Sequence, residues 1–312
     1  MHNGTGLWMG RARASRNKAP SRGASPTGRA GAAARQGVPW HDGSAYGLLT
    51  PNQLRGPAWR RLFPDVYVDR DVPVTHALRA RAACVLAVPG SVITGASAAA
   101  LWGVDLVSPE DEVELTVPPG RHAVRATGLR VRRCHVADEH VVVRRWVRVT
   151  SPEATAVRLA GHLPLEDAVV AVDRLIAARG LDLQNIRALA GAAVGAGSAR
   201  ARTACALADG LAESPQETRL RLLIGRSRLP QPVAQYRVRH GGRVVARVDF
   251  AWPDRKVALE YDGLWHAEDG QFANDRARLN RLREAGWTVV FVTAADMYQP
   301  AKLVARIAAA LA

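Results

Sequence analysis

Several residue types are scarce in this chain, and their scarcity excludes whole classes of protein. Only 3 of the 312 residues are cysteine. Cys84, Cys134 and Cys205 are widely spaced and form no CxxC pair, which argues against a disulfide framework or a zinc site. No stretch approaches the roughly 18 apolar residues that a membrane-spanning helix needs, and the N-terminus lacks the apolar segment of a secretory signal. We therefore expect a cytoplasmic protein with reduced thiols and no membrane partner.

Acidic residues are also few. Asp and Glu number 28 against 43 Lys and Arg, so the formal net charge is +15. Such an excess favours a polyanionic partner, and we expect that partner to be DNA. Residues 1–40 contain no acidic residue and are rich in Arg, Ala, Gly, Ser and Pro, which predicts a disordered basic tail. The tail either adds non-specific affinity for DNA or extends a reading frame that starts at Met9 or later.

The chain is 48% hydrophobic, which suits two small globular domains joined by linkers. Residues 41–72 predict a winged-helix-like segment. Thr50 and Pro51 are a typical N-cap and first residue of a short helix, 58–62 can form a second, basic helix, and 65–68 is β-like. The basic helix either reads a DNA groove or is a solvated face.

Residues 73–210 predict an α/β module without catalytic features. Its carboxylates are scattered, and no His, Cys or Ser constellation is present. It is expected to be a scaffold or a recognition module. Helices are expected at 76–88, 93–103, 151–159, 165–178, 183–190 and 199–207, and strands or apolar runs at 112–117, 129–133 and 141–149.

The N-terminal half resembles a family of bacterial proteins. The pattern LLT…QL…WRRL…VYV in 48–68, and the small-residue segment ITGASAAALWG in 93–103, are similar to AbiEi-type antitoxin-like proteins. This resemblance implies that residues 73–210 are an antitoxin-like module.

The most informative stretch lies in the C-terminal third, residues 211–312. Two short apolar runs, 247–252 and 256–262, flank a Pro-Asp-Arg turn, which predicts a β-hairpin. Strand side chains alternate between faces, so Glu260 and Asp262 share a face. Asp249 on the first strand is close enough in register to meet Glu260.

Gathering carboxylates on a half-buried hairpin is costly, because each loses water and each disfavours ionisation of its neighbours. A divalent cation removes this cost, and carboxylate oxygens suit Mg²⁺, with Mn²⁺ as a second option. We therefore expect Asp249 and Glu260 to be metal ligands. The alternative is a solvated face whose acids pair with nearby arginines.

The order of elements expected around the hairpin is αβββαβ, with an acid on the second strand and an ExD pair ending the third. This order, with the motifs ESPQE, VDFAWP, LEYDGLWH and DRARLNRLREAGW between Glu213 and Trp287, resembles the PD-(D/E)xK nuclease superfamily. The finer match is to its branch near the very-short-patch-repair endonucleases. The resemblance covers residues 213–312 and implies a restriction-endonuclease-like domain that hydrolyses DNA with Mg²⁺ held by Asp249 and Glu260.

One position departs from the superfamily pattern. The usual lysine two residues after the glutamate is replaced here by Asp262, which leaves the general base open. His266 follows Gly263, where the chain can turn back over the site, and a histidine with a near-neutral pKa can act as a base or bind phosphate. Either Asp262 or His266 would orient the attacking water, unless His266 is only a surface loop residue.

The helices on either side of the hairpin contribute further candidates. Glu217 completes a capping box that begins at Ser214, and related nucleases also draw a catalytic acid from this helix, a role for which Glu213 is a lesser candidate. The later helix carries arginines that either contact phosphate or form a solvated face. These are Arg276, Arg278, Arg281 and Arg283.

Two functions remain open from the sequence. The first is a metal-dependent DNA endonuclease that uses Asp249, Glu260, Asp262, His266 and Glu217. The second is a DNA-binding regulator, or antitoxin-like protein, in which the nuclease fold is catalytically silent. The two metal-ligand carboxylates favour the enzyme, and the missing lysine favours the silent fold.

Overall fold

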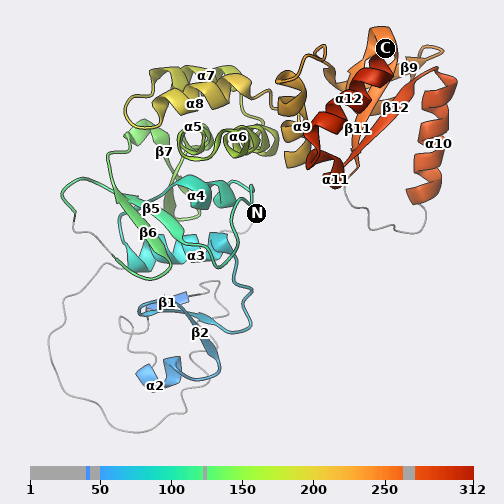
Figure 1. Ribbon diagram of the computed structural model, residues 1–312. Coiled ribbons are helices and arrows are strands. Elements are labelled where there is room, and N and C mark those ends of the chain that lie inside the picture. The colour runs from blue at the N-terminus through green and yellow to red at the C-terminus, as the bar shows by residue number, and fades with distance from the viewer. Residues whose placement is uncertain (1–39, 43–49, 122–124, 263–270) are drawn as a thin grey trace, which may run out of the picture.

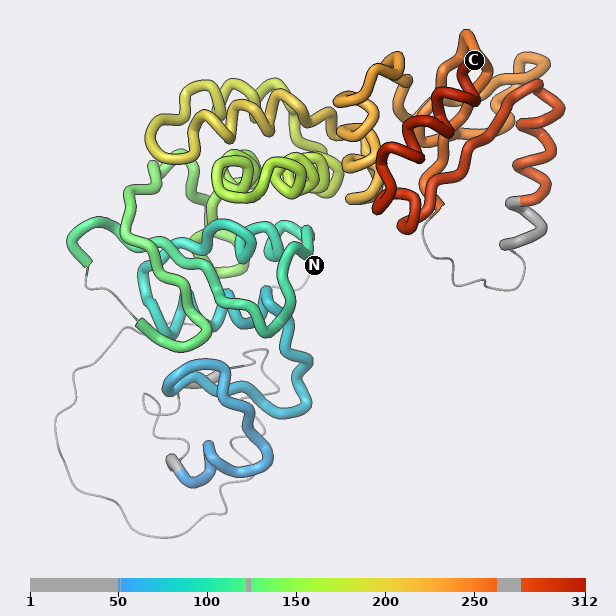
Figure 2. The backbone as a smooth tube through the Cα atoms, viewed as in Figure 1, coloured from blue at the N-terminus to red at the C-terminus, as the bar shows by residue number. Residues whose placement is uncertain are grey.

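The computed structural model describes residues 40–42, 50–121, 125–262 and 271–312, which form a mixed α/β chain with three β-sheets. The sheets follow one another along the chain (Figure 2). No helix in these ranges is both long and apolar enough to cross a bilayer. The expected basic tail, residues 1–40, lies outside the described residues except for Trp40.

The first sheet corrects one expectation. It has the order β1-β3-β2, with β1 (Trp40–Asp42), β2 (Trp59–Phe63) and β3 (Val66–Asp69), and the short helix α2 (Pro51–Leu54) precedes β2. The prediction of a second, basic helix at 58–62 is wrong, because residues 59–63 form strand β2. Pro64 and Asp65, whose φ is 59°, make a tight turn that pairs β2 with β3 and buries Val66 and Val68.

The module expected at residues 73–210, called the middle module below, contains a five-stranded sheet of order β6-β5-β4-β8-β7. The apolar run at 141–149 forms two strands rather than one, because the chain reverses at Arg145 and Trp146. The strands are β4 (Val92–Ile93), β5 (Val113–Val117), β6 (Leu129–Arg133), β7 (Val141–Arg144) and β8 (Val147–Thr150).

Helices of the middle module begin and end close to the expected positions. Ser151 accepts a hydrogen bond from the Ala154 N–H at the start of α5, and Gly180 ends α6 with a positive φ of 62°, as helix-capping chemistry predicts. The helices are α3 (His76–Ala82), which continues as a π-helical turn (Ala83–Ala87), α4 (Gly95–Leu101), α5 (Pro152–His162), α6 (Leu165–Arg179), α7 (Leu183–Ala192) and α8 (Ser198–Leu207).

The C-terminal domain has the expected element order, followed by two further helices. Its sheet has the order β12-β11-β10-β9, in which β11 and β12 are parallel and the other pairs are antiparallel. The elements are α9 (Pro215–Gly225), β9 (Val233–His240), β10 (Arg243–Trp252), β11 (Val257–Asp262), α10 (Gln271–Glu284), β12 (Thr288–Thr293), α11 (Ala294–Met297) and α12 (Pro300–Leu311).

Helices cover both faces of this sheet, and the strand alternation decides which side chain each face receives. Phe250 and Leu259 pack with Leu220 of α9 and Ile307 of α12 in one core. Val248 and Ala258 pack with Leu282 of α10 in the second. Figure 1 shows α10 on one side of the sheet and α12 on the other. Because β11 alternates, Glu260 shares the α10 side with Ala258.

A buried aspartate joins the middle module to the C-terminal domain. Asp173 of α6 is fully buried, and its carboxylate accepts hydrogen bonds from the backbone N–H groups of Asp209 (3.0 Å) and Gly210 (2.8 Å). It also accepts from the Thr218 hydroxyl (2.9 Å) and the Arg221 guanidinium (2.8 Å) of α9. Four donors therefore offset the desolvation of one carboxylate and fix α9 against α6.

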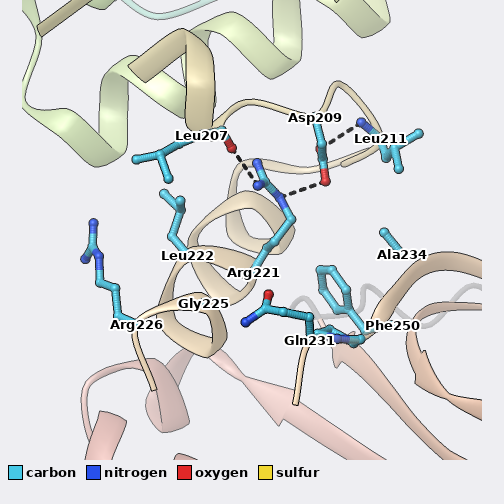
Figure 3. Close-up of a pocket in the computed structure, with 11 residues that line it drawn as sticks. Leu207, Asp209, Leu211, Arg221, Leu222, Gly225, Arg226, Gln231, Ala234 and Phe250 are labelled. Atoms are coloured by element: carbon cyan, nitrogen blue, oxygen red, sulfur yellow. Dashed lines mark hydrogen bonds and ion pairs between the residues drawn. The ribbon is translucent and has the colours of Figure 1, made fainter. Parts of the chain in front are cut away.

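A cavity of about 480 Å³ opens beside this junction. Arg221 reaches across it to the Leu207 carbonyl and the Asp209 carboxylate (Figure 3). Phe250 at its wall belongs to the core between the sheet and α9. The cavity therefore lies on the opposite side of the sheet from Glu260. It is a feature of the junction rather than of the hairpin carboxylates.

Candidate active site

The backbone of β9 and β10 is distorted where the first hairpin carboxylate lies. Gln235 has a φ of 51°, an uncommon conformation for a residue with a side chain. The ladder pairs Tyr236 with Val248 and Ala234 with Phe250, so Gln235 lies opposite Asp249. Tyr236 and Val248 pack on the α10 side, whereas Ala234 and Phe250 pack on the other side. The strands therefore change faces at Gln235 and Asp249.

The side chain of Asp249 reaches the neighbouring strand. Its Oδ2 accepts a hydrogen bond of 2.8 Å from the Tyr261 N–H. The backbone ladder between β10 and β11 extends only from Trp252–Val257 to Phe250–Leu259. The Asp249 carboxylate thus accepts from the Tyr261 N–H, which lies beyond the last backbone pair of the two strands. Tyr261 directly follows Glu260 in the chain. The expectation that the Asp249 and Glu260 carboxylates meet stays a prediction, and this hydrogen bond places Asp249 at the residue that follows Glu260.

Glu260 is held by an arginine of α10. It is buried, with 8% of its surface exposed, and both of its oxygens accept hydrogen bonds from Arg278, one of them at 2.8 Å. Arg278 also donates to the Arg247 carbonyl at 2.7 Å. The pairing of acids with arginines, which the sequence offered as the alternative to metal binding, is therefore present at Glu260.

Glu217 brings a third carboxylate from α9. The Ser214 hydroxyl accepts from the Glu217 N–H at 3.2 Å, as expected for a cap. The Glu217 side chain, however, accepts from the Glu213 N–H at 2.9 Å and from the Gln235 side-chain amide at 3.0 Å. Glu217 thus does not bond the N–H of the N-cap residue itself. It is 7% exposed and is tied to the distorted position of β9.

The electrostatics join these carboxylates into one cluster. Burial raises the pKa of Asp249, and the neighbouring charges of Glu260 and Glu213 add to this effect. The Tyr261 N–H and Arg278 oppose it. Burial also raises the pKa of Glu217, and the charge of Asp249 contributes in the same direction. Two carboxyls are thus destabilised as anions, which is common at functional sites and at buried ion networks alike.

The other expected site residues are placed less completely. Asp262 ends β11 and is half-buried. By strand alternation it shares the face of Glu260. His266 lies outside the described residues, so its expected role stays a prediction. Glu213 is more exposed and pairs with Arg247 at 2.6 Å.

Two participants were not predicted at this place: Gln235 was not a candidate, and Arg278 was one only as a phosphate contact or part of a solvated face. Arg278 was one of several arginines on its helix, yet it precedes the buried Leu282 by four residues. A helix places such residues on one face, so this spacing could have identified it as facing the sheet. Gln235 carried no comparable signal, because a positive φ in a strand cannot be read from one Val-Ala-Gln-Tyr stretch.

Two proteins of Mycobacterium tuberculosis, the uncharacterized protein MT2308 of strain CDC 1551 and the uncharacterized protein Rv2248 of strain H37Rv, are similar to this chain. Each is 35% identical over 216 residues, which cover 68% of this chain and 78% of the relative. The chain belongs to the family of these proteins. No family model matches it, and no solved structure matches it. Membership assigns no activity, because both relatives are uncharacterized.

In this family member, the donor atoms near Asp249 are of the kind a hard cation prefers. They are carboxylate oxygens and the Gln235 side-chain oxygen, which is buried without a hydrogen-bond partner among the described residues. Within the same ranges, no three His, Cys, Asp or Glu side chains are grouped so that they could hold a metal. The chemistry of these oxygen donors fits a divalent cation. In this structure, however, both oxygens of Glu260 accept hydrogen bonds from Arg278.

Proposed function

We propose that the C-terminal domain is a restriction-endonuclease-like domain that hydrolyses DNA phosphodiesters with a divalent cation, Mg²⁺ or Mn²⁺. The observation that carries this proposal is the cluster of Asp249, Glu260 and Glu217. Three separate elements, β10, β11 and α9, contribute to it, and burial raises the pKa of two members. Carboxyls whose pKa is raised by burial and by neighbouring carboxylates are frequent at sites that bind a cation or carry out a reaction, which supports the proposal.

Asp249 and Glu260 would hold the cation. The buried, unpartnered oxygen of Gln235 is a further hard donor beside them. A cation bound there would lower the pKa of a bound water and offset the negative charge of the phosphate. Asp262 and His266 remain the candidates for orienting that water, and Glu217, whose pKa is raised by burial, is a third group that could accept a proton.

Arg278 has a defined role in this proposal. Its guanidinium already makes a two-pronged contact with the Glu260 carboxylate, and the same planar geometry matches two oxygens of a phosphate. We propose that Arg278 holds Glu260 ordered in the absence of substrate and binds the phosphate of the DNA in its presence. The guanidinium would then supply the positive charge that the missing superfamily lysine supplies elsewhere.

A second function is supported by the same ion pair. If Arg278 never leaves Glu260, the carboxylate is neutralised permanently and the domain is a DNA-binding regulator without catalysis. The two functions make different demands on Asp249. A nuclease needs its negative charge to bind the cation, whereas a silent domain needs only an acceptor for the Tyr261 N–H. Asn at 249 can accept that bond.

Nicking of supercoiled plasmid tests the proposal. Wild-type protein should convert supercoiled plasmid to nicked or linear DNA with Mg²⁺ or Mn²⁺ and not with EDTA. Asp249→Asn should lose most of this activity, while Asp254→Asn, which removes an equal charge from the exposed turn of the same hairpin, should keep it. Equal activity of the two variants, or no metal-dependent nicking by wild type, would contradict the nuclease function and leave the regulator.

A further inference from the structure

The β-hairpin of the middle module ends in a turn that is unusual for its residues. Arg145 and Trp146 connect β7 to β8 with φ values of 46° and 71°. Two-residue hairpin turns with positive φ normally use Asn and Gly, because larger side chains are strained there. Trp146 is nevertheless 76% exposed. The turn therefore holds a large aromatic ring in water at the cost of both backbone strain and apolar exposure.

Four arginines lie at or near the turn end of this hairpin. Arg144 and Arg179 both stack on the ring of Trp102, with their guanidinium carbons 4.7 Å and 5.4 Å from its centroid. Arg81 of α3 lies close enough to Arg144 and Arg145 that their charges act on it. Helices α3 and α6, strand β7 and the turn thus bring four positive charges together at the end of the hairpin that carries Trp146. We refer to Arg81, Arg144, Arg145 and Arg179 as the arginine cluster.

No acidic group of the described chain neutralises the arginine cluster. None of its four guanidiniums makes a hydrogen bond or ion pair with another described residue, and the Arg81 Nε is buried without a partner. Two other arginines of the same module do have partners. Arg130 binds Glu112 at 3.0 Å, and Arg79 donates to two backbone carbonyls.

The cluster is electrostatically unfavourable as it stands. Burial lowers the pKa of Arg81, and the charges of Arg145 and Arg144 lower it further. Burial, then Arg179 and Arg145, lowers the pKa of Arg144 in the same way. Guanidiniums that lose water and repel one another are stabilised when an anion joins them.

We propose that this hairpin is a binding site for single-stranded nucleic acid, in which the arginine cluster contacts phosphates and Trp146 stacks on an unpaired base. A positively charged groove with an exposed aromatic ring is how proteins bind single strands, because every base offers a face for stacking. Guanidiniums suit the backbone because their planar donors match phosphate oxygens. The proposal also accounts for the strained turn, because this turn holds the Trp146 ring exposed, where a base can stack on it.

This proposal is independent of catalysis in the C-terminal domain. It concerns residues 81–179 only, and binding in EDTA measures it without cleavage. An acidic membrane surface is the other polyanion that arginines and tryptophan can meet. It is disfavoured here because Val143 is the only other large apolar side chain of the described hairpin that is exposed, so little apolar surface is available to enter a bilayer.

Binding of the full chain to a labelled oligothymidylate in EDTA, followed by anisotropy over a range of salt, tests the site. Trp146→Ala should weaken binding roughly 5-fold to 150-fold, as expected for loss of one stacked base. Trp146→Phe should retain most of the affinity. Arg145→Ala should lower the slope of log K against log salt by about 0.7. The matched controls are Val143→Ala on the same hairpin and Arg130→Ala, which removes an equal charge from a paired arginine.

Several outcomes would overturn the proposal. One is equal binding by Trp146→Ala and Val143→Ala, and another is an equal salt slope for Arg145→Ala and Arg130→Ala. Competition by inorganic polyphosphate as strong as by unlabelled oligothymidylate would reveal a phosphate site without base stacking. Vesicles rich in phosphatidylserine that bind through Trp146, when the oligonucleotide does not, would assign the hairpin to a membrane surface. Asp249→Asn, which tests nicking, should bind oligothymidylate in EDTA as wild type does, so the two proposals can fail separately.

Discussion

Replacing Arg278 by alanine separates the two roles of its ion pair with Glu260. The Glu260 side chain is 10% exposed and that of Arg278 is 31% exposed, so the pair is more buried than a surface bridge. Removing one partner of a buried pair costs about 3–5 kcal/mol, whereas an exposed pair contributes about 0.2–1 kcal/mol. We expect Arg278→Ala to lower the free energy of unfolding by about 2–3 kcal/mol, between these limits.

Mg²⁺ should reverse most of this loss if Asp249 and Glu260 hold a cation. A ligand present at a hundred times its Kd stabilises the folded protein by about 2.7 kcal/mol, which is close to the expected deficit. The response of Arg278→Ala to Mg²⁺ should also exceed that of wild type, because in wild type Arg278 competes for the oxygens of Glu260. Urea denaturation followed by tryptophan fluorescence, with Mg²⁺ or EDTA, measures both effects.

Arg226→Ala is the matched control. Arg226 forms an ion pair with Glu166, but both side chains are about half exposed, at 51% and 46%, so its loss should cost less than about 1 kcal/mol. Its response to Mg²⁺ should equal that of wild type. A destabilised Arg278→Ala that responds to Mg²⁺ no more than Arg226→Ala would refute the reasoning, since Glu260 would then be a structural partner of Arg278 and not a ligand.

Two further predictions concern stability. The pKa of Asp249 is raised in the folded state, so the folded protein loses stability as pH rises through the ordinary carboxyl range and up to that raised pKa. Asp249→Asn should therefore be more stable than wild type at neutral pH in EDTA, with a gain that vanishes as pH falls to about 4. A less stable variant at neutral pH would contradict this. Asp173→Ala strands four donors at the domain junction and should cost about 3–5 kcal/mol in urea unfolding. The exposed Asp167→Ala should cost below about 1 kcal/mol, and equal losses would show that Asp173 does not join the domains.

Local patterns were sufficient for most of the C-terminal domain. The alternation of β11 predicts that Glu260 lies on the face opposite Leu259, and the hydrogen bond from Arg278 of α10 to Glu260 confirms it. The Ser214 cap and the hairpin depend on neighbouring residues only, which is why they are readable from the chain.

Features that depend on distant residues were not predictable in the same way. The positive φ of Gln235 is held by its bond to Glu217 and its position opposite Asp249, and neither lies near it in sequence. The helix expected at 58–62 failed because pairing with β3 outweighed a basic, helix-compatible composition. The clustering of Arg81, Arg144 and Arg179 likewise requires three elements that are separated by up to about 100 residues.

Binding of Mn²⁺ to the purified full chain, measured by electron paramagnetic resonance, tests most directly whether the carboxylate cluster is a metal centre. The account predicts one bound Mn²⁺ per wild-type chain, displaced by excess Mg²⁺ and lost in Asp249→Asn. The exposed Asp254→Asn should bind as wild type does. Wild-type protein that leaves all Mn²⁺ free, or Asp249→Asn that binds it as well as wild type, would contradict the central claim.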